Sequence, residues 1–161
     1  MELEVKIKGL MIDPISNLPI VILKPADSEA VLPIWVGIFE ANAIALQIES
    51  ISTPRPMTHD LVKNLLETLQ AKIEKIVITD LRDSTFYALI HVTCQGETFH
   101  VDSRPSDAIA IALRTESRIY VEEDVISRAK KIDFPKEPAE NEKLKKWLEN
   151  LDPEDLGKYE M

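Results

Sequence analysis

Cysteine and glycine are both scarce in this chain of 161 residues, and their scarcity excludes several classes of protein. The single cysteine, Cys94, rules out an internal disulfide and a zinc site built from thiolates. The four glycines form no phosphate-binding loop, and neither a Gly-x-Ser-x-Gly elbow nor a His-Glu-x-x-His pair occurs. These absences argue against a dinucleotide-binding fold and against the hydrolases that depend on those two motifs.

Long apolar runs and a basic surface are also missing. No run is long enough to cross a bilayer, and the N-terminal residues lack the apolar stretch of a signal peptide, so we expect a cytoplasmic protein without a membrane partner. The net charge of −9 provides no general attraction for nucleic acid. A nucleic-acid site would have to be local, built from a few arginines, helix starts and a divalent cation that offsets the carboxylates.

The hydrophobic pattern predicts an α+β domain over residues 1–132 and a charged helical tail over residues 133–161, hinged at prolines. The strand-rich opening, a hairpin closed by Gln95-Gly96 and the lack of regular βαβ alternation predict a mixed, largely antiparallel sheet with helices packed on it. Strands are expected at 2–12, 18–23, 31–36, 73–81, 86–94, 97–102 and 119–121. Helices are expected at 37–49, 58–72, 104–114, 122–131 and 139–150.

Three of these helices differ in their predicted environment. The helices at 37–49 and 104–114 are apolar on nearly every side, which predicts burial and allows a homodimer interface. The helix at 58–72 has an ordinary apolar stripe, with His59 and Asp60 expected on its wet side. The side chains expected in its buried stripe are Leu61, Val62, Leu65, Leu66 and Leu69.

Two short segments have the composition of a chemical site. Residues 54–61 read Pro-Arg-Pro-Met-Thr-His-Asp-Leu, and residues 102–110 read Asp-Ser-Arg-Pro-Ser-Asp-Ala-Ile-Ala. Each runs from Arg-Pro through a hydroxyl and an aspartate into a helical pattern, which indicates a helix start. Helix starts bind anions such as phosphate, and an aspartate there faces the positive end of the helix dipole. The alternative interpretation of each segment is simply a well-formed N-cap.

The individual residues of these segments admit two interpretations each. Asp107 begins a helix that is expected to be buried, so it needs a partner, with Arg104 nearest in sequence and Arg55 the other candidate. Such a pair is either a salt-bridged cap or part of an anion or metal–phosphate site. His59 is either a surface histidine in a cap or a general base, phosphate contact or metal ligand. The helix dipole disfavours imidazolium at this end, so a neutral ring is the expected active form.

A second histidine pair lies in the predicted hairpin. A two-residue turn at Gln95-Gly96 pairs Cys94 with Glu97 and places His91 directly opposite His100. The two imidazoles are close enough to share a metal ion, but spacing identifies no third ligand, and a half-wet sheet face is the interpretation that we favour. Cys94 falls on the other face and is expected to be a core thiol.

Five blocks occur in order along the chain: Gly9-Leu10 with Asp13-Pro14, Leu32 to Gly37 with Glu40-Ala41, Arg55 to Leu61, Thr85 to Ala88, and Asp102 to Ala110. Taken together, they resemble the bifunctional nuclease family, a bacterial and plant domain family. The resemblance covers about residues 1–130. It implies an α+β domain and a nuclease that acts on both DNA and RNA.

The residues themselves then give our hypothesis, a phosphodiesterase that acts on nucleic acid with Mg²⁺ or Mn²⁺. His59 activates water, while Arg55 and Arg104 neutralise the scissile phosphate. The carboxylates that hold the cation are Glu40, Asp60 and Asp107. Two alternatives are a non-catalytic module that binds an anion, nucleotide or protein, and a structural homo-oligomer. The hypothesis requires the loops of Arg55 and Arg104 to meet in one water-accessible hollow.

Overall fold

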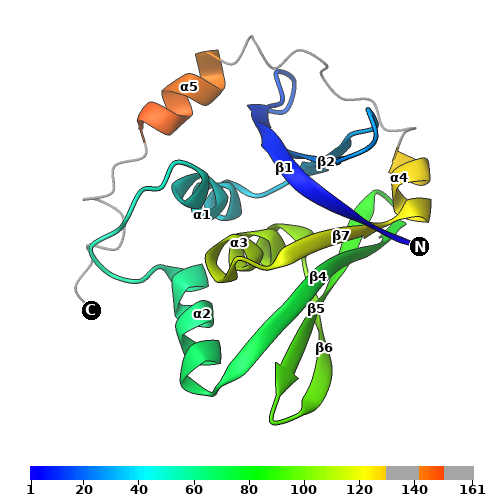
Figure 1. Cartoon of the computed structure of the whole chain (residues 1–161). Helices are drawn as coiled ribbons and strands as arrows, with labels where there is room; N and C mark the ends of the chain where they lie inside the picture. The colour runs from blue at the N-terminus through cyan, green and yellow to red at the C-terminus, as the bar shows by residue number, and fades with distance from the viewer. Residues whose placement is uncertain (130–141, 151–161) are drawn as a thin grey trace.

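The structure is a computed structural model that describes residues 1–129 and 142–150. Figure 1 shows its strands and helices. The strands are β1 (Glu2–Ile12), β2 (Pro19–Pro25), β3 (Leu32–Trp35), β4 (Ala71–Arg82), β5 (Thr85–Cys94), β6 (Glu97–Ser103) and β7 (Arg118–Glu122). The helices are α1 (Ile38–Ile48), α2 (Thr58–Thr68), α3 (Pro105–Thr115), α4 (Glu123–Ala129) and α5 (Glu142–Glu149).

The strands form one sheet in the order β3-β2-β1-β7-β4-β5-β6. Every pairing is antiparallel except that of β4 with β7, which is parallel, so the expected mixed and largely antiparallel α+β architecture is confirmed. Pro33 lies on the edge strand β3, where its missing N–H breaks no inner ladder. The late strand β7 lies in the middle of the sheet and joins the first strands of the chain to the β4–β6 meander.

The main core lies between one face of the sheet and the helices α1, α3 and α4. Ile44, Ile109 and Val125 from these helices share one buried cluster with Ile76 and Val121 of the central strands. Over β7, β4, β5 and β6 the opposite face of the sheet carries a row of polar side chains. There Arg118, Lys75, His91 and His100 lie opposite one another, in register, across β7, β4, β5 and β6.

Helix α2 differs from its prediction in both length and orientation. It ends at Thr68 because Gln70, at a φ of 57°, turns the chain directly into β4. The expectation that the apolar stripe of α2 is buried is wrong for Leu61, Leu65 and Leu69, which are 52%, 52% and 66% exposed.

Polar contacts explain the rotation of α2. His59 and Asp60 face α3, and only Val62 and Leu66 of the expected stripe pack against the main core. The exposed leucines leave an apolar stripe on the outside of α2. The homodimer stays a prediction, which sedimentation of the purified protein would test.

Two other expectations concern the ends of elements. The hairpin register is confirmed, with Cys94 opposite Glu97 and His91 opposite His100. The expectation that Cys94 lies in the core is wrong, since it is half-buried at the end of β5, with its thiol 3.8 Å from the carbonyl oxygen of Leu69.

The charged tail is described only over α5 and the residue that follows it. A helix is found there as expected, and its Trp147 packs against the main core. The expected hinge at the prolines, Pro135 and Pro138, and the boundary at residue 132 lie outside the described residues. The division into two parts therefore stays a prediction.

Candidate active site at three helix starts

Helices α1 and α2 both pack against α3 (Figure 1), and side-chain contacts join the starts of all three. Each turn follows a residue in extended conformation, namely Gly37, Met57 and Arg104. Pro105 fixes the first residue of α3, as the sequence predicts for a helix start. Glu40, His59 and Asp107 each lie within the first three residues of one of these helices. The positive ends of three helix dipoles are therefore brought to one place.

A continuous chain of side-chain contacts joins the three helix starts. His59 Nε2 lies 2.8 Å from Oδ1 of Asp107, and Arg104 donates from Nε and Nη2 to Oδ2 of the same carboxylate at 3.0 and 2.9 Å. Arg104 Nη2 also donates to Oε1 of Glu40 at 2.6 Å. The order of contacts is Glu40, Arg104, Asp107, His59, and we call this set the helix-start cluster.

The four side chains of the cluster differ in their exposure to solvent. The side chains of His59, Glu40 and Asp107 are 12%, 14% and 29% exposed, whereas that of Arg104 is 67% exposed. Hydrogen bonds from Arg104 to Asp107, and then to Glu40, raise the pKa of Arg104 above its ordinary value. Arg104 is therefore a permanent cation at the surface. In the described part of the chain its Nη1 group donates to no protein acceptor.

Gly37 makes room for the carboxylate of Glu40. A Cβ added at Gly37 would overlap Oε2 of Glu40, which folds back over the start of α1. The backbone of Gly37, at a φ of −69°, is open to other residues, so the constraint comes from this close approach alone. Sequence reasoning identified Gly37 only as the residue that opens the helix.

Asp60 is not a member of the helix-start cluster. Its Oδ1 accepts a 2.6 Å hydrogen bond from Nε of Arg114, and its Oδ2 accepts one at 2.9 Å from the backbone N–H of Met57. The Arg114 side chain is 3% exposed and also donates to the carbonyl oxygens of Ala110 and Ala43. One guanidinium thus connects α1, α2 and α3, and Asp60 balances its buried charge.

Arg55 lies in the loop before α2 and lines a separate hollow. This hollow, of about 340 Å³, is also lined by Asp60, Lys63 and Arg114, and not by any member of the helix-start cluster. The backbone oxygen of Arg55 accepts a hydrogen bond from Thr53, and its side chain forms no ion pair within the described residues. The structure therefore brings together Glu40, His59, Arg104 and Asp107, and places Arg55 beside the Asp60–Arg114 pair. The expectation that the loops of Arg55 and Arg104 share one hollow is wrong, because Asp60 and Arg114, and not the cluster, line the hollow of Arg55.

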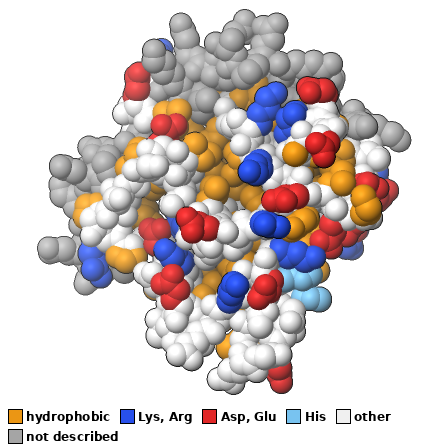
Figure 2. Space-filling view, viewed as in Figure 1, with side chains coloured by type: hydrophobic (Ala, Val, Ile, Leu, Met, Phe, Trp, Pro, Cys, Tyr) orange, Lys and Arg blue, Asp and Glu red, His pale blue; other side chains and the backbone are white. Residues whose placement is uncertain are grey.

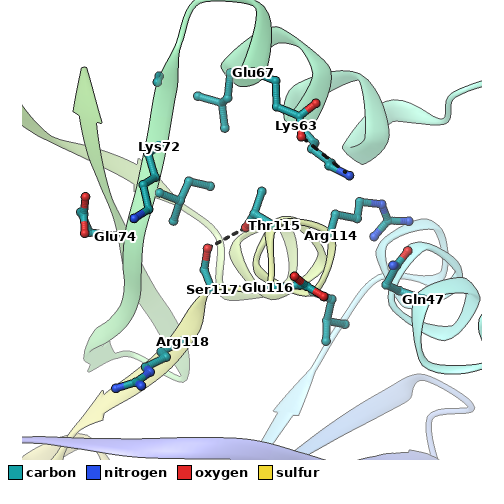
Figure 3. Close-up of a pocket in the computed structure, with 14 residues that line it drawn as sticks. Gln47, Lys63, Glu67, Lys72, Glu74, Arg114, Thr115, Glu116, Ser117 and Arg118 are labelled. Atoms are coloured by element: carbon teal, nitrogen blue, oxygen red, sulfur yellow. Dashed lines mark hydrogen bonds and ion pairs between the residues drawn. The ribbon is translucent and has the colours of Figure 1, made fainter. Parts of the chain in front are cut away.

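A larger cleft, of about 690 Å³, lies toward the other end of α3 (Figure 3). It shares Gln47, Lys63 and Arg114 with the hollow beside Arg55, so the two adjoin. Its wall contains no histidine. It contains charges of both signs, among them Lys72, Glu74, Glu116 and Arg118. A cleft is the default place to look for a site. Because this cleft contains no histidine, the helix-start cluster, with His59 and the exposed Arg104, is the candidate active site.

The surface agrees with the acidic composition. On the face shown in Figure 2, Lys and Arg side chains are interspersed with Asp and Glu side chains.

Among the described residues, no three His, Cys, Asp or Glu side chains form a group that would hold a metal ion. No helix in this part of the chain combines the length and apolarity needed to span a membrane.

The imidazole rings of His91 and His100 lie on the polar face of the sheet, with their centroids 4.2 Å apart. Burial lowers the pKa of His91 below its ordinary value, and the charges of His100 and Lys75 lower it further, against an opposing effect of Glu2. These effects together favour the neutral form of the His91 imidazole.

Arg114 is the residue beside the site whose role sequence reasoning missed. It stands seven residues after Asp107, on the one polar stripe of an otherwise apolar helix. That spacing equals about two helical turns and places both side chains on one face. The signal was present, but it did not identify Asp60 as the partner.

The fold and the site together define a class of protein. It is an α+β domain with a histidine–carboxylate–arginine cluster at the starts of its helices. The bifunctional nuclease domain model matches residues 21–133, and the chain belongs to this family. The chain is 37% identical over 163 residues to the uncharacterized protein Rv1829 of Mycobacterium tuberculosis. The match covers 95% of this chain and 97% of that protein.

Plant relatives match a smaller part. Bifunctional nuclease 1 of Oryza sativa subsp. japonica is 30% identical over 105 residues, which are 63% of this chain and 32% of the rice protein. Bifunctional nuclease 2 of the same rice is 29% identical over 107 residues, or 64% of this chain and 33% of that protein. The chain thus spans about a third of the length of these named nucleases.

Proposed function

We propose that this protein hydrolyses phosphodiester bonds of nucleic acid at the helix-start cluster. The observation that supports this most directly is the 2.8 Å contact between His59 and Asp107, with Arg104 on the second oxygen of the same carboxylate. Family membership and the names of the rice relatives agree with it.

The contact between His59 and Asp107 assigns a role to each ring nitrogen. A neutral imidazole that donates from Nε2 to Asp107 carries its lone pair on Nδ1. Nδ1 is then the atom that accepts a proton from the attacking water, and Asp107 stabilises the imidazolium that results. General-base catalysis of this kind contributes about 10²- to 10⁴-fold to a rate.

Arg104 is the proposed phosphate contact. Its exposed guanidinium is held by Glu40 and Asp107 in one orientation, so little side-chain entropy is lost when its free Nη1 group meets a phosphate oxygen. Hydrogen bonds from a fixed cation are worth most when negative charge develops in the transition state. Because Arg55 lies beside a different hollow, we propose that it contacts a more distant phosphate of the same strand.

The divalent cation remains part of the proposal in a narrower form. Glu40 and Asp107, which also accept hydrogen bonds from the exposed Arg104, are the carboxylates that would hold Mg²⁺ or Mn²⁺, while Asp60 balances the buried charge of Arg114. Two carboxylates are a normal protein contribution to Mg²⁺, with substrate phosphate and water supplying the remaining oxygens. When bound, such an ion would stabilise charge on the phosphoryl group.

The test is cleavage of single-stranded DNA and RNA by the purified chain and its histidine variants. His59→Gln is expected to lower the rate by about 10²- to 10⁴-fold. His100→Gln, prepared in the same way, controls for contaminating nucleases and for the loss of a histidine elsewhere. Equal cleavage by both variants and the wild type would refute the assignment.

The cation is tested in the same assay with EDTA and added Mg²⁺ or Mn²⁺. Glu40→Gln is expected to raise the metal concentration that gives half-maximal cleavage, because it removes one of the two proposed ligands. Cleavage that is insensitive to EDTA would remove the cation from the proposal and leave the roles of His59 and Arg104 in place.

A non-catalytic binding module is the second candidate, since the carboxylates of the cluster are already paired with Arg104. It predicts oligonucleotide binding that depends on Arg104, with no cleavage above the level of His59→Gln.

A further inference from the structure

Phe39 is an aromatic side chain that the fold leaves almost bare. It is 85% exposed, and Phe99 is the one other exposed aromatic residue in the described part of the chain, at 49%. Ile38, immediately before it, is 53% exposed, although the rest of α1 contributes Ala41, Ile44 and Ala45 to the core at 0% exposure. Among the described residues, this phenyl ring at the start of a largely buried helix therefore takes little part in packing.

The position of Phe39 connects it to the helix-start cluster. It precedes Glu40, whose carboxylate accepts the 2.6 Å hydrogen bond from Arg104. Phe39 therefore lies one residue from the partner of the proposed phosphate contact, in the first turn of α1, where backbone N–H groups are free of helical acceptors. The segment that carries this exposed ring is joined to the fixed cation through Glu40.

We propose that Phe39 is a stacking platform for a nucleobase and that the substrate of this site is a single strand. The inference rests on the proposed phosphate contact at Arg104. A base whose own phosphate, or the neighbouring one, lies on Arg104 is within reach of a ring beside Glu40. Aromatic rings stack on every base, which gives affinity without sequence preference, and only an unpaired base exposes its face for such stacking.

Charge favours a nucleotide over a second copy of this chain as the occupant. A protein interface that extended from Phe39 over the helix-start cluster would have to cover Arg104, which is 67% exposed, and desolvate its charge. A nucleotide supplies an apolar ring face for Phe39 and an anion for Arg104 together.

The experiment measures binding of the full chain to labelled probes by fluorescence anisotropy, in EDTA and again in Ca²⁺. The probes are an oligothymidylate of about 10 nucleotides, the same backbone carrying abasic sites throughout, and a duplex of equal length. The variants are Phe39→Ala and Phe39→Trp. Ile15→Ala is the matched control, because Ile15 is an exposed apolar side chain, at 90%, in the turn after β1.

Phe39→Ala is expected to weaken oligothymidylate binding by about 5- to 150-fold while affinities for the abasic strand and the duplex stay unchanged. Phe39→Trp is expected to retain or improve binding, and Ile15→Ala to have no effect. Equal losses on all three probes, an unchanged affinity for oligothymidylate, or no binding by the wild type in either buffer would overturn the proposal. So would a change of sedimentation coefficient in Phe39→Ala without a change in affinity, which would mean that Phe39 contacts a second copy.

This result is separable from the proposed nuclease activity. If Phe39→Ala loses oligothymidylate binding but the wild type cleaves no faster than His59→Gln, the platform stands and the nuclease proposal fails. If cleavage depends on His59 and binding is indifferent to Phe39, the nuclease proposal stands and the platform is wrong.

Discussion

Nε of Arg114 donates a 2.6 Å hydrogen bond to Oδ1 of Asp60 from a side chain that is only 3% exposed. The residue before Asp60 is His59, which contacts Asp107, seven residues before Arg114. Two neighbours on α2 therefore hold α3 at points about two turns apart. One of these contacts stabilises the fold, and the other forms the proposed catalytic pair.

Asp60→Asn is expected to lower the free energy of unfolding by on the order of 3 kcal/mol, because it leaves the buried charge of Arg114 without an opposite charge. Urea denaturation of the purified variant measures this. Glu67→Gln, which removes the exposed i,i+4 pair with Lys63, is the control and should cost less than about 1 kcal/mol. A similar small loss in both variants would contradict the role assigned to Asp60.

The same pair predicts a dependence of stability on acid. Burial alone would raise the pKa of Asp60, but hydrogen bonds from Met57 and Arg114, with the charge of Arg114, lower it below its ordinary 3.8. A carboxyl with a lowered folded-state pKa contributes stability above its unfolded pKa and loses it as the pH falls through the folded value. The wild type should therefore lose more stability than Asp60→Asn below about pH 3.8.

Gly37→Ala is expected to lower cleavage activity while leaving the melting temperature nearly unchanged. The added Cβ overlaps Oε2 of Glu40, a flexible side chain that moves away at little cost and thereby releases Arg104. Glu40→Gln should reduce activity in the same direction, and the double variant should lose no more than the larger single effect. Additive losses would mean that Gly37 acts independently of Glu40.

Arg104→Lys tests geometry separately from charge. Lysine keeps the cation but not the planar fork that reaches Glu40 and Asp107 together, so cleavage should fall although net charge is unchanged. Because Arg104 is 67% exposed, the free energy of unfolding should change by less than about 1 kcal/mol. Full activity of the lysine variant would show that charge alone is needed.

The exposed stripe of α2 predicts a contrast between adjacent leucines. Leu66 packs against the main core, whereas Leu65 is 52% exposed. Leu66→Ala should therefore cost about 2 kcal/mol and Leu65→Ala less than about 1 kcal/mol in urea denaturation. The reverse order would mean that α2 is rotated relative to this structure, or that a partner covers Leu65.

His91 predicts a second effect of acid at higher pH. Its folded-state pKa is lowered by burial and by His100 and Lys75, so the unfolded chain takes up the proton more readily. Stability should fall as the pH drops below about 6.5, and His91→Gln should reduce that fall. His100→Gln should reduce it partly, since the charge of His100 is only one of the causes. Equal slopes in all three proteins would contradict the lowered pKa.

Local chemistry in the sequence was enough to predict most elements. Alternation over residues 2–12, the Gln95-Gly96 turn and Pro105 before an apolar run each correspond to an observed strand, hairpin or helix start. Periodicity also explains why Arg104 pairs with Asp107, since residues three apart on a helix start are within reach of one another. Such signals depend only on residues that are close in the sequence, so they can be recognised without knowledge of the tertiary structure.

Contacts between distant segments could not be predicted in this way. The rotation of α2, which exposes Leu61 and Leu65, depends on Asp107 and Arg114 of a helix about 50 residues later. Apolar spacing predicted the opposite face, because it contains no information about polar partners elsewhere. Likewise nothing local placed β7 at the centre of the sheet.

The residue types of the candidate site and its position at helix starts are thus properties of the amino-acid order. Which of those residues meet was decided by packing: Glu40, Arg104, Asp107 and His59 converge, while Asp60 turns to Arg114 and Arg55 to a neighbouring hollow. The physical reason is that a buried charge must find an opposite charge, and only the folded chain determines which one is within reach.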